Sequence, residues 1–310
     1  MKRELTIATR SSRLALWQAE WARESIGGFF PQTEIRLSPI KTQGDKILDV
    51  PLAKIGGKGL FVKELEVALL NHEADIAVHS MKDVPVELPA GLEISVIAKR
   101  ERPNDAFVSN RFPSFASLPQ NAVVGTSSLR RVAQLRRLRP DLRYKSLRGN
   151  VNTRVGKLDE GSYDAIVLAA AGLIRLNMAD RIAEMLPFNV SLPAIGQGAV
   201  CIESRVGDEE TLALVKPLTD AQTTSEIRAE RALLQRLNAG CQVPLAGFAT
   251  LGNGTIELTG LVASEDGNTV IKIRETGPEP NAEALGVSVA EKLLRQGAGA
   301  ILADLGIEAH

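Results

Sequence analysis

Short apolar runs alternate with amphipathic stretches along the first hundred residues of this 310-residue chain. The runs predict strands, and apolar residues at helical spacing, such as Trp17 and Trp21, predict helices. Ser11 or Ser12 is placed to cap the first helix. The predicted strands cover residues 5–9, 34–40, 76–78 and 92–98, and the second predicted helix covers residues 61–70.

A polar, proline-containing break at residues 99–104 is followed by a second passage of the same plan. Strands are predicted at residues 122–125, 142–147 and 165–168, with helices at 129–138 and 151–158. A strand followed by threonine, serines and a helix occurs twice, at Thr9-Arg10-Ser11-Ser12 and at Thr126-Ser127-Ser128. This repetition predicts two α/β lobes of similar plan.

The last third of the chain follows a flexible break at residues 192–198. A strand at 200–203 suggests that the chain crosses back to the first lobe there. A helix at 226–237, three strands and a helix at 282–296 then predict a small α+β domain. The predicted domains are residues 1–98 with 199–216, residues 104–192, and residues 221–310.

Composition excludes several classes of protein. The chain has 37 basic and 37 acidic residues, so no global charge directs it to nucleic acid or a membrane. Its two cysteines, Cys201 and Cys241, form neither a disulfide framework nor a zinc pattern, which suits a reducing cytoplasm. The residues after Met1 lack the apolar core of a signal peptide, and the longest apolar run is too short to span a membrane. The histidine spacing predicts no metal site.

Positive charge is concentrated in the second lobe between Arg130 and Arg154, a stretch whose only acidic residue is Asp141. Arg130 and Arg131 open the helix that Ser128 caps, where free backbone N–H groups also attract anions. Arginine favours bidentate pairing with carboxylate or phosphate, so the sequence predicts an anion site. The alternative is a basic, solvated surface helix. The run comprises Arg130, Arg131, Arg136, Arg137, Arg139, Arg143, Lys145, Arg148 and Arg154.

Asp83 is the strongest candidate for chemistry. It follows a buried strand and precedes Pro85, and ligands bind at the carboxyl ends of strands in open α/β sheets. The alternative is an Asx-type turn in which its carboxylate serves only the backbone. Lys82 would then be a surface charge, and His79 is typical of a hydrogen-bonded core histidine.

Two further features are ambiguous from the residues alone. The glycine-rich loop at residues 42–59 carries Lys54 and Lys58 but lacks the spacing of a nucleotide P-loop, so it is predicted to be a lid. Cys241 follows a helix C-terminus, where the dipole disfavours a thiolate. Such a thiol suits either a small buried residue or an anchor that is modified once.

Four motifs occur in order along the chain. They are His79-Ser80-Met81-Lys82-Asp83-Val84-Pro85, Gly125-Thr126-Ser127-Ser128-Leu129-Arg130-Arg131, Arg148-Gly149-Asn150-Val151-Asn152-Thr153-Arg154 and Gly240-Cys241-Gln242-Val243-Pro244. Together they resemble the motifs of the porphobilinogen deaminase family, and the resemblance extends from the first strand to the C-terminal domain.

The resemblance implies an α/β fold with two lobes like type II periplasmic binding proteins and a small α+β C-terminal domain. It also implies a transferase of tetrapyrrole and haem biosynthesis. Such an enzyme joins four porphobilinogen molecules head to tail, releases ammonia and gives hydroxymethylbilane. The growing chain is built on a dipyrromethane cofactor that a thioether attaches, by motif match, to Cys241.

Roles for individual residues also follow from the resemblance. Asp83 is the catalytic carboxylate, which faces pyrrole N–H groups. The cofactor is held by Cys241, Lys82, Thr126, Ser128, Arg130, Arg131 and Gly149. Substrate and growing chain are held by Arg10, Ser12, Phe61, Arg148, Arg154, Arg175 and Gln197. Lys54 and Lys58 lie in the lid.

Two other classes of protein remain open on the residues alone. Two hinged lobes with arginines would suit a solute-binding protein for a dicarboxylate, although no signal peptide is predicted. A nucleic-acid binder is less well supported, because the positive charge is confined and only Tyr144 interrupts the basic run. The expected protein is a cytoplasmic monomer without nucleic-acid or membrane partners.

Overall fold

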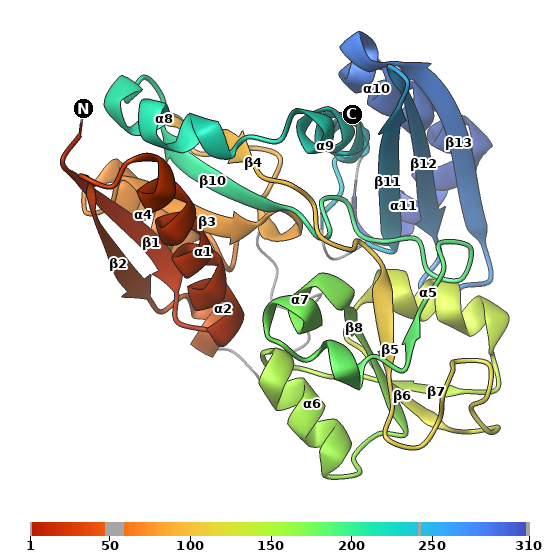
Figure 1. The fold of residues 1–310 in the computed structure, drawn as a ribbon. Coiled ribbons are helices and arrows are strands. Elements are labelled where there is room, and N and C mark those ends of the chain that lie inside the picture. The colour runs from red at the N-terminus through yellow and green to blue at the C-terminus, as the bar shows by residue number, and fades with distance from the viewer. Residues whose placement is uncertain (1, 47–58, 241–242, 308–310) are drawn as a thin grey trace. The chain divides into compact units, whose positions relative to one another are not determined.

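The computed structural model describes residues 2–46, 59–240 and 243–307. Its contacts divide the chain into two compact units (Figure 1). The first comprises Met1–Leu48, Gly57–Glu101 and Ala199–Thr224, and the second comprises Asp49–Gly56, Arg102–Gly198 and Ser225–His310.

The first unit is built on a five-stranded sheet in the order β2-β1-β3-β10-β4. The strands are β1 (Glu4–Arg10), β2 (Glu34–Ile40), β3 (Ile76–Ser80), β4 (Leu92–Ile97) and β10 (Val200–Arg205). The helices are α1 (Arg13–Phe29), α2 (Gln43–Lys46), α4 (Lys63–Leu70) and α8 (Glu209–Val215), with 3-10 turns η1 (Met81–Asp83) and η3 (Lys216–Leu218). β1 is parallel to β2 and β3, whereas β10 is antiparallel to both of its neighbours.

Local signals explain where these elements begin. Ser12 caps α1, because its Oγ accepts a hydrogen bond from the Ala15 amide at 3.3 Å. The sheet is apolar on both faces, as a largely parallel sheet covered by helices must be. Ile76 and Val78 of β3 pack with α1 on one face, and Ala77 packs with α4 on the other.

The second unit contains another five-stranded sheet, in the order β7-β6-β8-β5-β9. Its strands are β5 (Asp105–Val108), β6 (Val123–Gly125), β7 (Arg143–Lys145), β8 (Ala165–Ala169) and β9 (Glu184–Met185). Its helices are α5 (Leu129–Leu138), α6 (Val151–Asp159) and α7 (Ala170–Arg175), with 3-10 turn η2 (Ala179–Arg181). β6 is parallel to β7 and β8, and β5 is antiparallel to β8, so this sheet repeats the plan of the first. β5 and β9 were not predicted: β9 has only two residues, and β5 begins with the charged Asp105, so neither shows the apolar run typical of a strand.

A three-stranded antiparallel sheet forms the C-terminal domain. It consists of β11 (Leu245–Gly252), β12 (Thr255–Ala263) and β13 (Val270–Pro278), covered by α9 (Ala221–Arg236) and α10 (Ala282–Leu293). The 3-10 turn η4 (Glu279–Asn281) precedes α10, and η5 (Leu294–Ala298) and α11 (Gly299–Asp304) follow it. The helix predicted for residues 282–296 is present as α10 and the first residues of η5, and its helical backbone is interrupted directly afterwards at Gly297, which has a φ of 101°.

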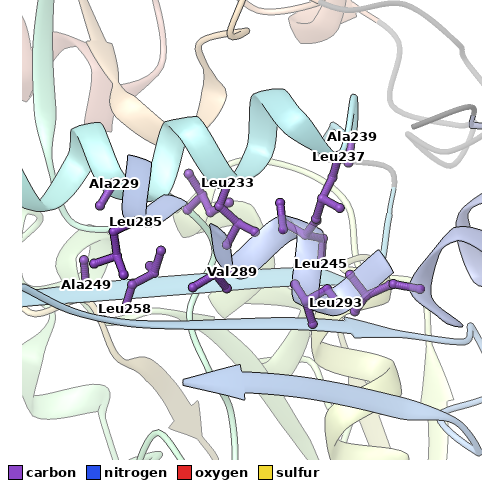
Figure 2. Close-up of a cluster of buried hydrophobic side chains, with 14 of the residues drawn as sticks. Ala229, Leu233, Leu237, Ala239, Leu245, Ala249, Leu258, Leu285, Val289 and Leu293 are labelled. Carbon is purple, nitrogen blue, oxygen red and sulfur yellow. The ribbon is translucent and has the colours of Figure 1, made fainter. Parts of the chain in front are cut away.

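The core of this domain lies between the two helices and the sheet (Figure 2). Leu233 of α9, Leu258 of β12 and Val289 of α10 are fully buried there. Burying a side chain of this kind contributes about 1.5–3 kcal/mol. The cluster therefore holds α9 and α10 firmly on the sheet.

The structure confirms the predicted α/β class, with two sheets of the same plan and a small α+β domain. The strand predicted at residues 200–203 is present as β10 and lies in the first sheet. The exact domain boundaries stay a prediction. Among the described residues, no helix is both long and apolar enough to cross a membrane.

Close packing of α9 on α10 predicts that Gly286→Ala destabilises the protein. An added Cβ would lie 2.7 Å from the Ala232 Cβ and 2.9 Å from the Leu233 amide nitrogen. Overpacking of this kind costs about 1–3 kcal/mol. Urea unfolding followed by circular dichroism should show a lower midpoint.

Gly156→Ala is the matched control, since this helical glycine has nothing within 4 Å of an added Cβ. It should leave stability unchanged or raise it by up to ~1 kcal/mol. An unchanged midpoint in Gly286→Ala would contradict the packing described here.

Candidate active site

Asp83 lies in the turn η1 immediately after β3. The Met81 amide donates to the Ala199 carbonyl at 3.0 Å, and the Val84 amide donates to the Met81 carbonyl at 3.2 Å, so backbone hydrogen bonds close the turn. The Asp83 side chain is half-buried and makes no hydrogen bond with any described residue. The Asx-turn alternative is therefore unsupported, and the carboxylate remains available to a ligand.

His79 precedes this turn and is the buried, hydrogen-bonded histidine expected from the sequence. Its Nε2 lies 3.0 Å from the Glu203 Oε2, and the two side chains are 3% and 0% exposed. This pair joins β3 to β10 across the sheet. His79 is therefore not placed as a base for substrate.

The end of β1 brings Arg10, Ser12 and Phe61 into the same unit. The Arg10 guanidinium lies 4.3 Å from the centroid of the Phe61 ring, a cation–π contact. Ser12 caps α1 through its side chain. Gly44 packs against the Phe61 ring at a position where a Cβ would collide with it. The aromatic ring thus supports the arginine in this structure.

The N-terminus of α5 is held by a network of hydroxyl groups. The Ser128 Oγ accepts from the Arg131 amide at 3.4 Å, and the Thr126 Oγ1 accepts from the Ser128 amide at 3.3 Å. The Ser127 Oγ donates to the Leu147 carbonyl at 2.6 Å and accepts from its amide at 3.1 Å. These bonds tie the turn after β6 to the residues before Arg148.

A second helix N-terminus follows the neighbouring strand, β7. Asn150 caps α6, and its Oδ1 accepts from the Thr153 amide at 2.9 Å. Gly149 has a φ of 116°, which favours glycine, and its carbonyl accepts from the Arg154 Nε at 2.7 Å. Burial lowers the pKa of Arg148. Because β6 and β7 are parallel neighbours, both helix N-termini lie at the same edge of the sheet.

Arg130 and Arg131 converge on a carboxylate that the sequence analysis did not single out. The fully buried Asp105, the first residue of β5, accepts from the Arg130 Nη1 and Nη2 at 2.7 and 3.1 Å. It also accepts from the Arg131 Nε and Nη2 at 2.9 and 2.7 Å. Ser191 Oγ donates at 2.7 Å and Gln197 Nε2 at 2.9 Å. We call these five residues the Asp105 cluster.

Charge and burial oppose each other in the Asp105 cluster. Burial alone would raise the pKa of Asp105, but the charges and hydrogen bonds of Arg130 and Arg131 outweigh it and hold that pKa far below its usual range. Burial lowers the pKa of Arg131, and the negative charge of Asp105 opposes this shift. Two guanidinium groups against one carboxylate leave the cluster a formal charge of about +1.

The two arginines keep capacity for a further anion. Each guanidinium has five N–H bonds. Arg130 uses three, to Asp105 and the Leu192 carbonyl, and Arg131 uses three, to Asp105 and the Val167 carbonyl. Two N–H bonds on each meet no acceptor among the described residues. This donor set fits a carboxylate-bearing group such as the predicted cofactor.

The remaining candidates are placed differently from one another. Arg175 is buried at the end of α7 and donates to the Gly198 carbonyl at 2.7 Å. Gln197 is buried and also donates to the Pro103 carbonyl at 2.7 Å. Lys82 is half-buried beside Asp83. Cys241, Lys54 and Lys58 lie outside the described residues, so their predicted roles stay predictions.

One signal in the sequence could have identified Asp105. It directly precedes the apolar run Ala106-Phe107-Val108, where an aspartate can be buried only if a cation accompanies it. The basic run that begins at Arg130 supplies such cations. The contact joins residues 25 positions apart, however, so no local pattern connects them.

Comparison with known sequences decides the family. A sequence model of the porphobilinogen deaminase dipyrromethane cofactor binding domain matches residues 5–213, and one of the porphobilinogen deaminase C-terminal domain matches residues 224–295. The chain belongs to the porphobilinogen deaminase family. It is 58% identical over 303 residues to a curated porphobilinogen deaminase of Syntrophotalea carbinolica, covering 98% of this chain and 96% of that one.

Solved structures that resemble the chain include binding proteins for small solutes. The methionine binding protein MetQ is 13% identical with a TM-score of 0.46, covering 71% of this chain and 91% of that one. A putative methionine-binding lipoprotein of Bacillus subtilis is 11% identical with a TM-score of 0.42, covering 72% and 92%. Similarity at this level adds nothing to the family assignment, which depends on the sequence matches. That assignment favours the enzyme over a solute-binding protein and over a nucleic-acid binder.

The Asp105 cluster predicts a large, pH-dependent loss of stability in Asp105→Asn. At neutral pH the variant should lose about 3–5 kcal/mol, because two buried guanidinium groups lose their counter-ion. The two guanidinium groups hold the folded pKa of Asp105 far below that of an exposed aspartate, so its stabilisation is complete above the ordinary aspartate pKa and declines as the pH falls below it. Urea unfolding between pH 3 and 7 should therefore show a stability gap between the two proteins that is constant above about pH 5 and begins to narrow towards pH 3.

Asp141→Asn provides the matched control. Asp141 also pairs with an arginine, at 2.7 Å from the Arg139 Nη2, but its side chain is 30% exposed. Its loss should lower stability far less than the loss of Asp105, because an exposed ion pair contributes little. A comparable loss in both variants would contradict the importance of burial at Asp105.

Proposed function

We propose that this chain is a transferase that polymerises porphobilinogen head to tail to hydroxymethylbilane on a dipyrromethane cofactor attached through Cys241. The family match over nearly the whole chain carries the proposal. Porphobilinogen is the substrate of this family, and the matched N-terminal domain binds a dipyrromethane cofactor. The attachment at Cys241 and the roles of individual residues are our inference.

The arginines suit the charge of such molecules. Each pyrrole unit carries an acetate and a propionate, so a growing chain accumulates carboxylates. Arg130 and Arg131 keep N–H bonds beyond those that Asp105 accepts, and Ser128 begins their helix. We assign Arg130, Arg131, Ser128, Thr126, Gly149 and Lys82 to the cofactor, and Arg10, Ser12, Phe61, Arg148, Arg154, Arg175 and Gln197 to substrate and growing chain.

The chemistry calls for one negative group among these cations. When bound, the cofactor supplies the pyrrole carbon to which substrate is joined. Loss of ammonia develops positive charge on the pyrrole nitrogen of the substrate, and a carboxylate near that N–H lowers the barrier. The half-buried Asp83 carboxylate, which makes no hydrogen bond with the described residues, suits this role and could also accept the proton released on coupling.

Other parts of the proposal depend on the sequence. Cys241 is unactivated by any neighbouring base in the sequence, which suits a thiol that forms one lasting thioether. Lys54 and Lys58 suit a lid over anionic substrate. The expectation of a cytoplasmic monomer without nucleic-acid or membrane partners stays a prediction.

Asp83→Asn should fold and carry the cofactor but turn over at least ~10²-fold more slowly, since the neutral amide cannot stabilise developing positive charge. Steady-state turnover, with intact-mass measurement of the cofactor, checks this. Asp180→Asn, at an exposed aspartate in η2, is the control and should keep normal turnover. Near-normal turnover in Asp83→Asn would overturn the assignment.

Cys241→Ala should lack the added mass of two pyrrole units in denaturing mass spectrometry, because no thiol remains to form the thioether. Cys201→Ala should retain it, since Cys201 is fully buried within the first sheet. Persistence of the adduct in Cys241→Ala would place the anchor elsewhere.

A further inference from the structure

The segment Ser191–Gly198, here called the linking segment, has no regular secondary structure and yet is almost completely buried. Buried irregular backbone must satisfy its polar groups within the protein. Gly196 and Gly198 adopt φ values of 73° and 93°, which allow the chain to turn sharply within this space. The segment lies entirely within the second unit.

One side of the linking segment is bonded to the second sheet and to α5. Arg130 Nη1 donates to the Leu192 carbonyl at 2.7 Å. The Gln134 side chain clasps the same residue, donating to its carbonyl at 3.1 Å and accepting from its amide at 2.8 Å. Ser191 and Gln197 both donate to Asp105. The segment therefore contributes two of its residues, Ser191 and Gln197, to the Asp105 cluster.

The other side of the linking segment is bonded to the C-terminal domain. The Glu230 Oε2 on α9 accepts from the Gly196 amide at 2.7 Å, and its Oε1 accepts from the Ala249 amide on β11 at 2.9 Å. The Gly247 amide donates to the Pro193 carbonyl at 3.2 Å. Ile195 is buried in the core that α9, α10 and the sheet share.

We propose that Glu230 and Gln134 are positioning residues that grip the linking segment from its two sides and so fix the C-terminal domain to the Arg130–Arg131 pair. The proposal rests on the proposed attachment of the cofactor in that domain. Glu230 bonds α9 to β11, the helix and the strand between which Cys241 falls in the sequence. A cofactor that is attached to the C-terminal domain and bound by Arg130 and Arg131 requires a fixed distance between that domain and the two arginines.

Small errors in that separation are costly. Misplacing a reacting group by about 1 Å can reduce a rate by ~10²-fold. The contacts of Glu230 and of Gln134 with the linking segment are buried hydrogen bonds. A buried amide that loses its acceptor is strongly disfavoured. Loss of either grip should therefore loosen the linking segment without removing any group that touches substrate.

A double-mutant cycle tests this in the holoenzyme. Glu230→Gln and Gln134→Met should each lower kcat by ~10-fold while the intact mass still includes the cofactor, a smaller loss than a full displacement of about 1 Å would cause. Because both residues act through one segment, the double variant should fall well short of the ~100-fold loss expected for independent sites. A fully multiplicative loss, or unchanged kcat in either single variant, would overturn the proposal.

Hydrogen–deuterium exchange provides a second readout. Peptides covering residues 191–198 should exchange at least ~10-fold faster in both single variants, since local opening becomes easier. Val289→Ala, which removes buried methyl groups from the same domain core, is the stability control and should leave kcat unchanged. An equal loss of kcat in Val289→Ala, or unchanged exchange at residues 191–198 in the single variants, would contradict a positioning role.

The outcomes separate this proposal from the proposed function. Wild-type protein that carries no dipyrromethane mass would refute the cofactor attachment. Wild-type protein that carries the mass, with variants whose kcat and exchange are unchanged, would refute the role of the linking segment alone.

Discussion

The second unit depends on one buried carboxylate between two guanidinium groups. Without Asp105, Arg130 and Arg131 would repel each other in a medium of low dielectric constant, and neither could stay buried. With it, the end of β5, the first turn of α5 and the linking segment meet at one point. The same interaction leaves a net positive charge and N–H bonds that meet no acceptor among the described residues, and these are the features on which the proposed anion site depends.

Asp83 in the first unit is in the opposite situation to Asp105. Backbone hydrogen bonds close the turn after β3, and His79 pairs with Glu203, while the Asp83 carboxylate makes no hydrogen bond within the described part of the chain. Electrostatic catalysis requires a carboxylate whose position is fixed by its backbone but whose oxygens are not already bonded to other protein groups. Asp105 and Asp83 thus illustrate two uses of the same side chain, set by what surrounds each.

The sequence predicted the features whose causes are local. Ser12 and Ser128 cap the helices expected of them, because a cap involves residues three positions apart. The strand at residues 200–203 and the strand that leads to Asp83 were also predicted correctly in type and place. Asp105 and the grip of Glu230 on Gly196 were not, since those contacts span 25 and 34 positions. The short strands β5 and β9 were missed for a related reason, because only their neighbours in the sheet stabilise them.

The position of β10 in the first sheet has a consequence for synthesis on the ribosome. β4 has no other neighbour than β10 in that sheet, although more than a hundred residues separate them in the chain. The N-terminal sheet therefore stays incomplete while the whole of residues 105–186 is translated, whereas the second sheet is contiguous and can close as it emerges. The N-terminal sheet is thus the first to be translated but the later of the two to complete its folding. Until β10 pairs with it, its unpaired strand edge is the surface that a nascent-chain chaperone would have to protect.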